Sequence, residues 1–259
     1  MRVAIVGSGG IAQRHLDVLA QIPDITVVGH VSADPERATA QARRWGGRAF
    51  ASMPVLLADA APEAVWLCVT PDRHGSIELA LIEAGVPFFV EKPLAGDLRT
   101  AETIATALLA PGGPIVAVGY KFRALDTLPR AHELLAERPP KMLLAAWHDA
   151  LPSPAWWRRA AQGGGQVVEQ ATHLLDLARV LVGEGEVVCG VGGQWPRAEA
   201  PDSEVPDVSA ALLRFVTRDG VIPGMLSATT LLRGRQAIHL QLVCEGRVLT
   251  LSERSLVID

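Results

Sequence analysis

The sequence has no run of about 18 apolar residues, the length that a membrane-spanning helix needs, although 49% of its 259 residues are hydrophobic. Residues 1–6 resemble an apolar strand with a single arginine, so we expect no signal peptide. Basic residues are dispersed and the net charge is −4. This charge distribution argues against nucleic acid or a membrane surface as a partner.

Cysteine is also scarce, and its positions show no metal-binding spacing. Cys68, Cys189 and Cys244 lie far apart in the sequence. Cys68 and Cys244 fall within apolar segments that read as strands, which favours buried thiols in a reducing compartment. We therefore expect a cytoplasmic protein.

A glycine-rich turn after the first apolar segment is the most informative feature that is present. Residues 2–12 read RVAIVGSGGIA. Gly7 permits a tight turn, Gly9 lets the backbone approach a pyrophosphate, and Ala12 allows close packing of a helix on the strand. The helix N-terminus offers free N–H groups and a positive dipole end to phosphates. The predicted dinucleotide-binding residues of this turn are Gly7, Ser8, Gly9, Gly10 and Ile11.

The first 120 residues alternate short apolar segments with helical patterns, which is typical of a parallel α/β sheet. The predicted strands are Arg2–Val6, Thr26–Val31, Val65–Val69, Phe88–Val90 and Ile115–Val118. The predicted helices are Ile11–Ala20, Pro35–Trp45, His74–Ala84 and Leu98–Leu109. Short connections between them indicate a doubly wound parallel sheet over residues 1–120.

The pattern changes after Tyr120, where strands mostly follow one another without intervening helices. Helices are predicted at Leu125–Ala136 and Val167–Val182. The predicted strands are Lys141–His148, Val187–Gln194, Val208–Val216, Val221–Thr230, Ala237–Cys244, Arg247–Leu251 and Leu256–Ile258. Residues 121–259 are therefore predicted to form an α+β domain with an open, mainly antiparallel sheet. The stretch Trp195–Asp207 is predicted to be an exposed loop.

The tripeptide Glu91-Lys92-Pro93 follows the fourth predicted strand. Ligands of open parallel sheets bind beyond the carboxyl ends of the strands. A lysine at that position can hydrogen-bond a substrate hydroxyl or carbonyl and help to move its proton. The alternative is a solvated loop lysine that pairs with Glu91.

A narrow polar stripe runs along the helix predicted after three consecutive glycines. At about 100° per residue, the stripe is about 80° wide and consists of Gln166, Glu169, His173 and Asp176. His173 can donate or accept a proton, and Glu169 one turn earlier can orient it or bind a sugar hydroxyl. A surface stripe with local ion pairs is the alternative. Two ligands on one helix are not a zinc signature, so no metal site is predicted.

Two strand ends hold further candidate cofactor contacts. Thr70 and Pro71 follow the third strand and could line a cofactor cleft, while His74 could reach a phosphate or only begin the next helix. Ser32 ends the second strand, where NAD-binding proteins normally carry an acid. Its neutral side chain, with Arg37 nearby, favours NADP over NAD.

Arg158 is a candidate phosphate contact in the second half of the chain. It follows Trp156 and Trp157, whose indoles could stack on a ring. A packed turn explains the two tryptophans equally well.

Taken together, these motifs resemble the Gfo/Idh/MocA oxidoreductase family. The motifs that carry the resemblance are the glycine turn, Thr70-Pro71 with His74, Glu91-Lys92-Pro93, Trp157-Arg158, Gly163-Gly164-Gly165, and the helix with Glu169, His173 and Asp176. The resemblance implies a Rossmann domain followed by an α+β domain for substrate binding and oligomerisation. It also implies hydride transfer between NAD(P) and a carbinol carbon of a sugar, cyclitol or related polyol. Lys92 would be the principal catalytic lysine, His173 the acid–base residue, and Glu169 the counterpart of the family's usual aspartate.

Two departures from the family pattern keep other functions open. Glu169 is one methylene longer than aspartate, and family members typically continue past the position of Asp259. A non-catalytic NAD(P)-binding sensor or scaffold is therefore a second hypothesis, and glycoside cleavage with transient use of NAD is a third. Because exposed sheet edges and faces need cover, we expect a homodimer or homotetramer.

Overall fold

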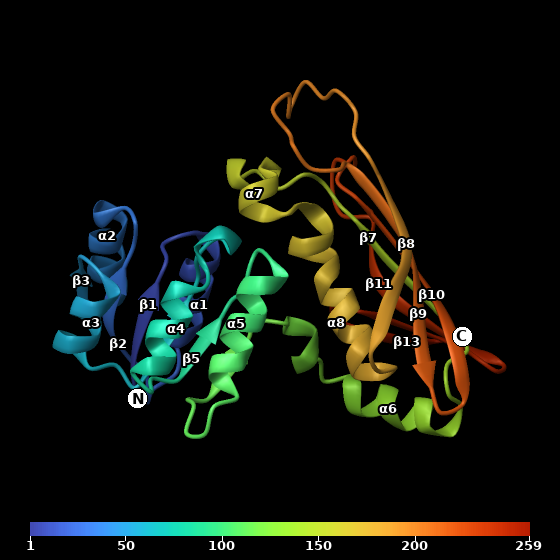
Figure 1. The fold of residues 1–259 in the computed structure, drawn as a ribbon, viewed down its shortest axis with the longest axis horizontal. Helices are drawn as coiled ribbons and strands as arrows, with labels where there is room; N and C mark the ends of the chain where they lie inside the picture. Colours follow the sequence, from blue (N-terminus) through green and yellow to red (C-terminus); the bar gives the residue numbers. More distant parts are fainter. The chain divides into compact units, whose positions relative to one another are not determined.

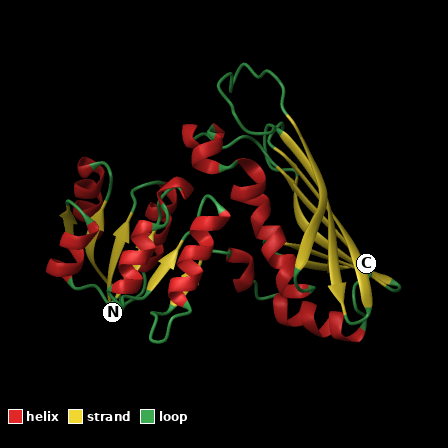
Figure 2. Cartoon of the chain, in the orientation of Figure 1, coloured by secondary structure: helices red, strands yellow, loops and turns green.

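The computed structural model describes every residue from Met1 to Asp259. The chain divides into two compact units, Met1–Gly119 and Tyr120–Asp259. Each unit has a hydrophobic core of its own. Figure 1 traces the elements along the chain, and Figure 2 separates helices from strands.

The first unit is a six-stranded parallel sheet with helices on its faces. The strands lie in the order β3-β2-β1-β4-β5-β6, and every neighbouring pair is parallel. Their bounds are β1 Arg2–Val6, β2 Thr26–Val31, β3 Arg48–Phe50, β4 Ala64–Leu67, β5 Phe88–Val90 and β6 Val116–Val118. The helices are α1 Gly10–Leu19, α2 Pro35–Trp45, α3 Met53–Ala60, η1 Pro71–Arg73, α4 Ser76–Glu83 and α5 Leu98–Leu108. The strand order reverses direction at β1 and β4, which confirms the predicted doubly wound sheet.

Besides the single turn η1, two elements of this unit, β3 and α3, were not predicted from the sequence. Strand β3 has three residues and lies at the sheet edge, too short for a period of two to show. Helix α3 buries Met53, Leu56 and Ala60, which lie on one face at helical spacing. Its early Pro54 occupies the first turn, where proline is tolerated.

The second unit is built on a seven-stranded sheet with the order β13-β12-β11-β7-β10-β9-β8. Only β7 and β10 pair in parallel, so the prediction of a mainly antiparallel sheet is confirmed. The strands are β7 Met142–His148, β8 Gly185–Gly193, β9 Val208–Thr217, β10 Gly220–Thr229, β11 Ala237–Cys244, β12 Arg247–Ser252 and β13 Leu256–Ile258. The helical segments are η2 Lys121–Ala124, α6 Leu128–Glu137, η3 Ala155–Arg158, α7 Ala160–Gly163, η4 Val167–Ala171 and α8 Thr172–Leu181.

Helix α8 runs along one face of this sheet, as Figure 1 shows. Leu174 and Leu177 of α8 pack with Leu143 of β7 and Leu240 of β11 in the core of the unit. Strand β11 alternates buried and half-buried residues, because successive side chains point to opposite faces of the sheet. No helix of the protein combines the length and apolar content that a membrane span requires.

Candidate functional site

Gly7 shapes the turn between β1 and α1. Its φ of 115° is a backbone conformation that favours glycine. A Cβ atom at this position would lie 2.1 Å from the carbonyl oxygen of Cys68, a distance that no side chain tolerates. The Gly7 N–H donates to the Val31 carbonyl at 2.8 Å, which ties the turn to the end of β2.

Gly9 and Gly10 leave open space at the N-terminus of α1. A Cβ atom on either glycine would meet no other atom within 4 Å. Gly9 caps the helix without a side-chain hydrogen bond, and Ile11 in the first turn is exposed. Helix N–H groups at such an end can donate to a phosphate. The residues of this turn therefore fit the pyrophosphate of a dinucleotide.

Ser32 lies directly after β2 and contacts the glycine turn. Its hydroxyl lies 2.7 Å from the hydroxyl of Ser8 and accepts the Asp34 N–H at 3.1 Å. Asp34 in turn caps α2 through the N–H groups of Glu36 and Arg37. Two neutral hydroxyl groups, those of Ser8 and Ser32, therefore lie side by side where β2 ends. The nearby Asp34 carboxylate is occupied by hydrogen bonds to the N-terminus of α2.

A pocket of about 420 Å³ opens between the glycine turn and α2. Its lining residues are Ser8, Gly9, Gly10, Gln13, Arg37, Ala40, Gln41, Arg44 and Trp45. Arg37 also lies 3.4 Å from Asp34, and Arg44 lies over the Trp45 ring and pairs with Asp17 at 3.2 Å. The pocket therefore places two cationic side chains next to the predicted phosphate-binding backbone.

Thr70, Pro71 and His74 occupy the segment after β4. The Thr70 hydroxyl donates to Asp72 at 2.5 Å, and buried Pro71 begins η1. The imidazole Nδ1 of His74 lies 2.6 Å from Glu78 Oε1, and both side chains are buried. Because Glu78 also accepts the Gly75 N–H at 2.6 Å, this pair fixes the start of α4. The arrangement is the helix-start role that the sequence left open for His74.

Glu91 and Lys92 follow β5 at the carboxyl-end edge of the sheet. The Glu91 carboxylate lies 2.7 Å from His15 Nε2 and accepts the Lys92 N–H at 3.2 Å. The His15 ring also meets Phe89 edge-on, with ring centroids 5.0 Å apart. His15 was not singled out in the sequence, because its partner lies 76 residues away. Lys92 is half-buried, and its peptide bond to Pro93 is cis.

The polar stripe of the second unit is buried rather than exposed. Its four members, each at most 5% exposed, are Gln166, Glu169, His173 and Asp176. The assumption of a regular α-helix is wrong here, because residues Val167–Ala171 form a π turn before α8 begins at Thr172. Such turns widen the helix locally and often occur at functional sites. The alternative of a solvated surface stripe is excluded by the burial.

Aromatic rings surround the imidazole of His173 within the second unit. Trp147 of β7 stacks on it with ring centroids 5.9 Å apart, and Phe122 of η2 is tilted against it at 5.6 Å. Tyr120 meets it edge-on at 5.9 Å. None of these aromatic residues was singled out in the sequence, because their contacts with His173 join residues far apart in the chain. The imidazole therefore lies in a mostly apolar environment.

Arg123 and Asp176 form a bidentate ion pair. The Arg123 Nε and Nη2 atoms donate to the two Asp176 oxygens at 2.8 and 2.7 Å. These hydrogen bonds raise the pKa of the Arg123 guanidinium, a group that is charged at any physiological pH. The pair joins η2 to α8.

Arg158 is engaged with the loop that follows β8. Its guanidinium lies 3.1 Å from Asp202, while the neighbouring Trp157 is buried. The prediction of an exposed loop over Trp195–Asp207 is only partly correct. Ala200, Val205 and Asp207 are buried within that loop, because Arg158, Arg159 and Arg197 hold its acidic side chains.

Comparisons with known proteins agree with this architecture. Residues 1–120 match the model of an oxidoreductase family with an NAD-binding Rossmann fold, and residues 140–249 match the GFO/IDH/MocA C-terminal domain. Myo-inositol dehydrogenase Hyg17 of Streptomyces leeuwenhoekii is 31% identical over 238 residues, which cover 88% of this chain and 69% of that protein.

A solved structure shows the same arrangement of elements. GenD2 from gentamicin A biosynthesis, in complex with NAD, is 25% identical with a TM-score of 0.79, and the match covers 100% of this chain and 72% of that one. Relatives are longer: the chain spans 34% of an uncharacterised Schizosaccharomyces pombe protein and 72% of inositol 2-dehydrogenase 4 of Saccharopolyspora erythraea, which is 26% identical over 95% of this chain. The chain therefore belongs to the GFO/IDH/MocA family of oxidoreductases, with an NAD(P)-binding Rossmann fold in its first 120 residues.

Proposed function

We propose that the protein is an NAD(P)-dependent oxidoreductase that transfers hydride to or from a carbinol carbon of a sugar, cyclitol or related polyol. The observation that carries this proposal is Lys92, which follows β5 at the same sheet edge as the open glycine turn after β1. Ligands of doubly wound sheets bind beyond this edge. The similarity to dehydrogenases named for inositol supports the substrate class.

The proposed roles follow from the chemistry of each side chain. A bound nicotinamide ring supplies the hydride acceptor or donor. The Lys92 ammonium donates a hydrogen bond to the reacting oxygen, and His173 accepts the hydroxyl proton in the oxidation and returns it in the reduction. Glu169, on the π turn before α8, orients the imidazole or binds a substrate hydroxyl. The proposed cofactor contacts are Gly7, Ser8, Gly9, Gly10, Ile11, Ser32, Thr70, Pro71, Glu91, Lys92 and Arg158. His74 is not among them, because its buried imidazole pairs with Glu78.

The test of these roles is a pair of substitutions with a matched control. Lys92→Met and His173→Gln are each expected to lower kcat by at least about a hundredfold, whereas cofactor affinity is largely retained. Lys141→Met removes an exposed lysine immediately before β7 and is expected to leave turnover unchanged. Turnover is followed by NAD(P)H absorbance with a panel of polyols and keto-sugars. Full activity of the Lys92 variant would refute its assigned role.

A non-catalytic cofactor-binding protein is the second candidate. Glu169 favours it, because the family's usual residue is aspartate and the longer side chain changes the distance to a substrate. This alternative predicts NAD(P)H binding without consumption across the whole substrate panel.

We also propose a preference for NADP over NAD. Ser8 and Ser32 present neutral hydroxyl groups where a carboxylate would repel a 2′-phosphate, and Arg37 lines the adjacent pocket. NADPH is therefore expected to bind at least as tightly as NADH in a fluorescence titration. A large preference for NADH would overturn this proposal.

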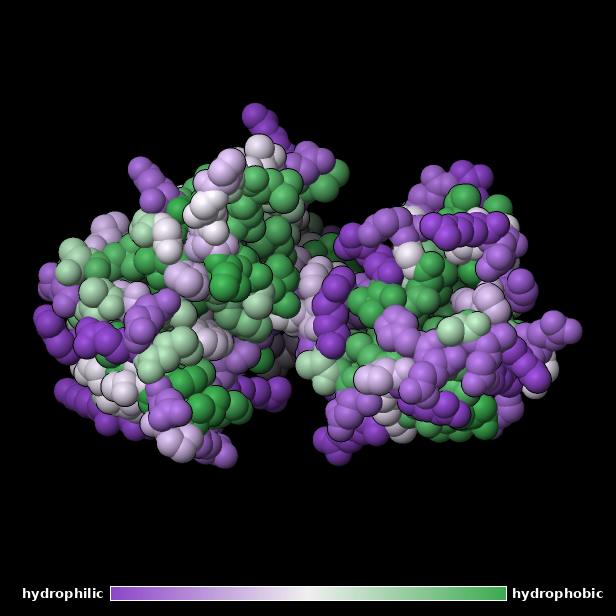
Figure 3. All heavy atoms as spheres, turned by 90° about the horizontal axis from the view of Figure 1, so that it is seen from below, coloured by the Kyte–Doolittle hydropathy of each residue, from purple (hydrophilic) through white to green (hydrophobic).

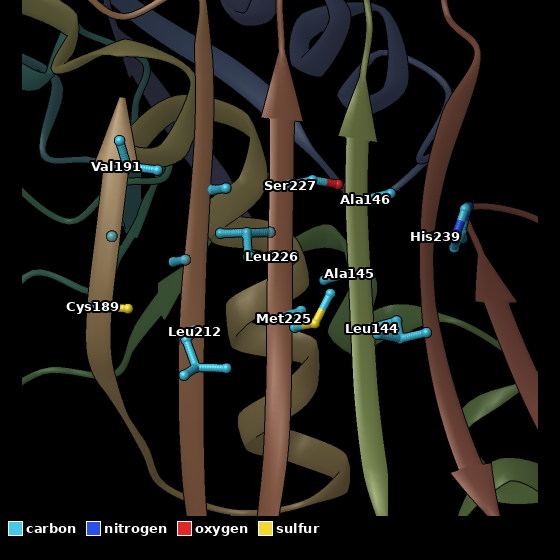
Figure 4. A pocket seen from close by; sticks show the side chains of 13 residues that line it. Leu144, Ala145, Ala146, Cys189, Val191, Leu212, Met225, Leu226, Ser227 and His239 are labelled. Atoms are coloured by element: carbon cyan, nitrogen blue, oxygen red, sulfur yellow. The ribbon is translucent and has the colours of Figure 1, made fainter. Parts of the chain in front are cut away.

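The second unit is proposed to bind the substrate and to associate with a second copy of the chain. The face of its sheet opposite α8 carries an apolar hollow of about 440 Å³. Figure 4 shows Leu212, Met225 and Leu144 projecting from neighbouring strands of this open face. Figure 3 shows hydrophobic and hydrophilic residues side by side on the face seen from below, and exposed hydrophobic residues among polar ones are ordinary on a protein surface. A contiguous apolar sheet face is typical of an interface.

A cytoplasmic location is proposed from the free thiols. Cys68 and Cys244 are buried and unbridged, and burial raises the pKa of both. Such thiols persist in a reducing compartment. Cell fractionation with an antibody against the protein tests this location.

A further inference from the structure

Arg123 holds a carboxylate that lies one helical turn from His173. The Asp176 side chain is 4% exposed, whereas that of Arg123 is 53% exposed. The Arg123 guanidinium therefore covers the buried Asp176 carboxylate on its solvent side. Both Arg123 hydrogen bonds are shorter than 2.9 Å and reach different carboxylate oxygens. This fork geometry fixes the direction of the guanidinium as well as its distance.

The ion pair also holds the four residues from Tyr120 to Arg123 against α8. Tyr120 and Phe122, which flank Lys121 in the same segment, both contact the His173 ring. The Tyr120 hydroxyl lies 3.3 Å from the Thr172 hydroxyl, and Phe122 is buried. One segment of four residues therefore carries two rings against the imidazole and the cation that anchors them.

The charges around this imidazole in the second unit are few. The titratable groups on η2 and the residue before it are Tyr120, Lys121 and Arg123, and those on the π turn and α8 are Glu169, Asp176 and Arg179. Lys121 is paired with Glu253, and Arg179 with Glu184. Strand β7 contributes the uncharged indole of Trp147. An unmatched Asp176 carboxylate would favour the protonated imidazole, and Arg123 offsets that charge.

We propose that Arg123 is a positioning residue for the reaction, which holds Tyr120 and Phe122 against His173 and neutralises Asp176 beside it. The proposal rests on the acid–base role of His173 in the proposed function. Arg123 acts through Asp176 and the two aromatic rings, and its own contact with substrate is not required.

The test measures kcat/KM against pH for Arg123→Met, Asp176→Asn and the double variant. Arg123→Met leaves the buried carboxylate unmatched, so we expect the pH midpoint assigned to His173 to move upward by about one unit. Asp176→Asn leaves the Arg123 cation without its partner, but this guanidinium is 53% exposed and screened by water, so the midpoint is expected to fall by less than about half a unit. The double variant is expected to return the midpoint to the wild-type value, which a merely structural role would not do.

Arg179→Met is the matched control, because Arg179 lies on α8, is equally exposed and also forms a bidentate pair. We expect its pH midpoint to equal that of the wild type. If Arg123→Met fails to fold, Arg123→Lys and Asp176→Asn are measured in its place. Arg123→Lys keeps the positive charge but not the two-point contact with Asp176, so its pH midpoint is expected to match that of the wild type while its rate stays lower. A wild-type midpoint in Arg123→Met, equal shifts for Arg123→Met and Arg179→Met, or a full rate in Arg123→Lys would overturn the proposal. Full activity of His173→Gln would instead refute the proposed function itself.

Discussion

The indole of Trp147 stacks on the imidazole of His173, with ring centroids 5.9 Å apart and planes inclined by 22°. Trp147 is buried in the core of the second unit and also stacks on Phe122. Trp147→Ala is expected to lower the free energy of unfolding by about 3–5 kcal/mol, because a large buried side chain is lost. Trp147→Phe retains a ring and is expected to lose less than half of that. Urea denaturation followed by circular dichroism measures both, and an Ala variant as stable as the wild type would contradict the described packing.

Alanine substitutions of Gly7 and Gly9 are expected to affect different properties, the first stability and the second cofactor affinity. Gly7→Ala forces a Cβ onto the Cys68 carbonyl at a positive φ, so stability should fall by about 3 kcal/mol. Gly9→Ala meets no protein atom, so the melting temperature should stay unchanged while NAD(P)H binds about tenfold more weakly. Thermal unfolding and fluorescence titration separate the two effects. Gly234→Ala, in open space within a loop, is the neutral control.

Ser32→Asp is expected to reverse the preference for cofactor. The new carboxylate would repel a 2′-phosphate and bind a free ribose hydroxyl, so NADPH affinity should fall at least about tenfold relative to NADH. Arg37→Ala should weaken NADPH alone, because Arg37 lines the pocket beside the glycine turn. Arg43→Ala, on the same helix but outside that pocket, should change neither affinity. Equal losses for both cofactors would refute a 2′-phosphate contact.

Buried His30 should make the protein less stable in mild acid. Burial lowers the pKa of His30 from 6.5, an effect that a hydrogen bond to the Gly46 carbonyl partly offsets. Because the unfolded chain then binds the proton more readily, the stability that neutral His30 contributes is present above pH 6.5 and is lost as the pH falls below it. Between about pH 7.5 and 5.5, the free energy of unfolding of His30→Gln should fall by roughly 1 kcal/mol less than that of the wild type. Urea denaturation at both pH values measures this difference. His132→Gln, an exposed position, should leave the pH dependence unchanged.

Met225 should matter for self-association more than for folding. Met225 of β10 lies opposite Leu212 of β9, and both are substantially exposed on the open sheet face. A glutamate at position 225 would introduce a charge into the proposed interface, so Met225→Glu should dissociate oligomers at micromolar concentration. Sedimentation equilibrium measures this change, with Leu109→Glu as an exposed control outside the sheet. A wild-type protein that is monomeric at micromolar concentration would refute the interface.

Most strands and helices could be predicted because their signals are local. The strands Arg2–Val6, Thr26–Val31 and Ala237–Cys244 were predicted with the observed bounds, since apolar runs and alternation are written in consecutive residues. Helix α2 begins as expected at Pro35, because Asp34 supplies the cap and proline suits the first turn. The three-residue strand β3 escaped prediction, because its residues show no periodicity and its pairing with β2 stabilises it.

The sequence by itself determined the doubly wound sheet, the glycine turn and the family, because each depends on residue types at short, regular spacing. Only the tertiary structure decided that the polar stripe is buried, that a π turn interrupts its helix, and that Arg123 pairs with Asp176. That pair joins residues 53 positions apart. No local sequence pattern encodes this ion pair. It forms only because core packing brings η2 onto α8 and buries the Asp176 carboxylate where the two segments meet.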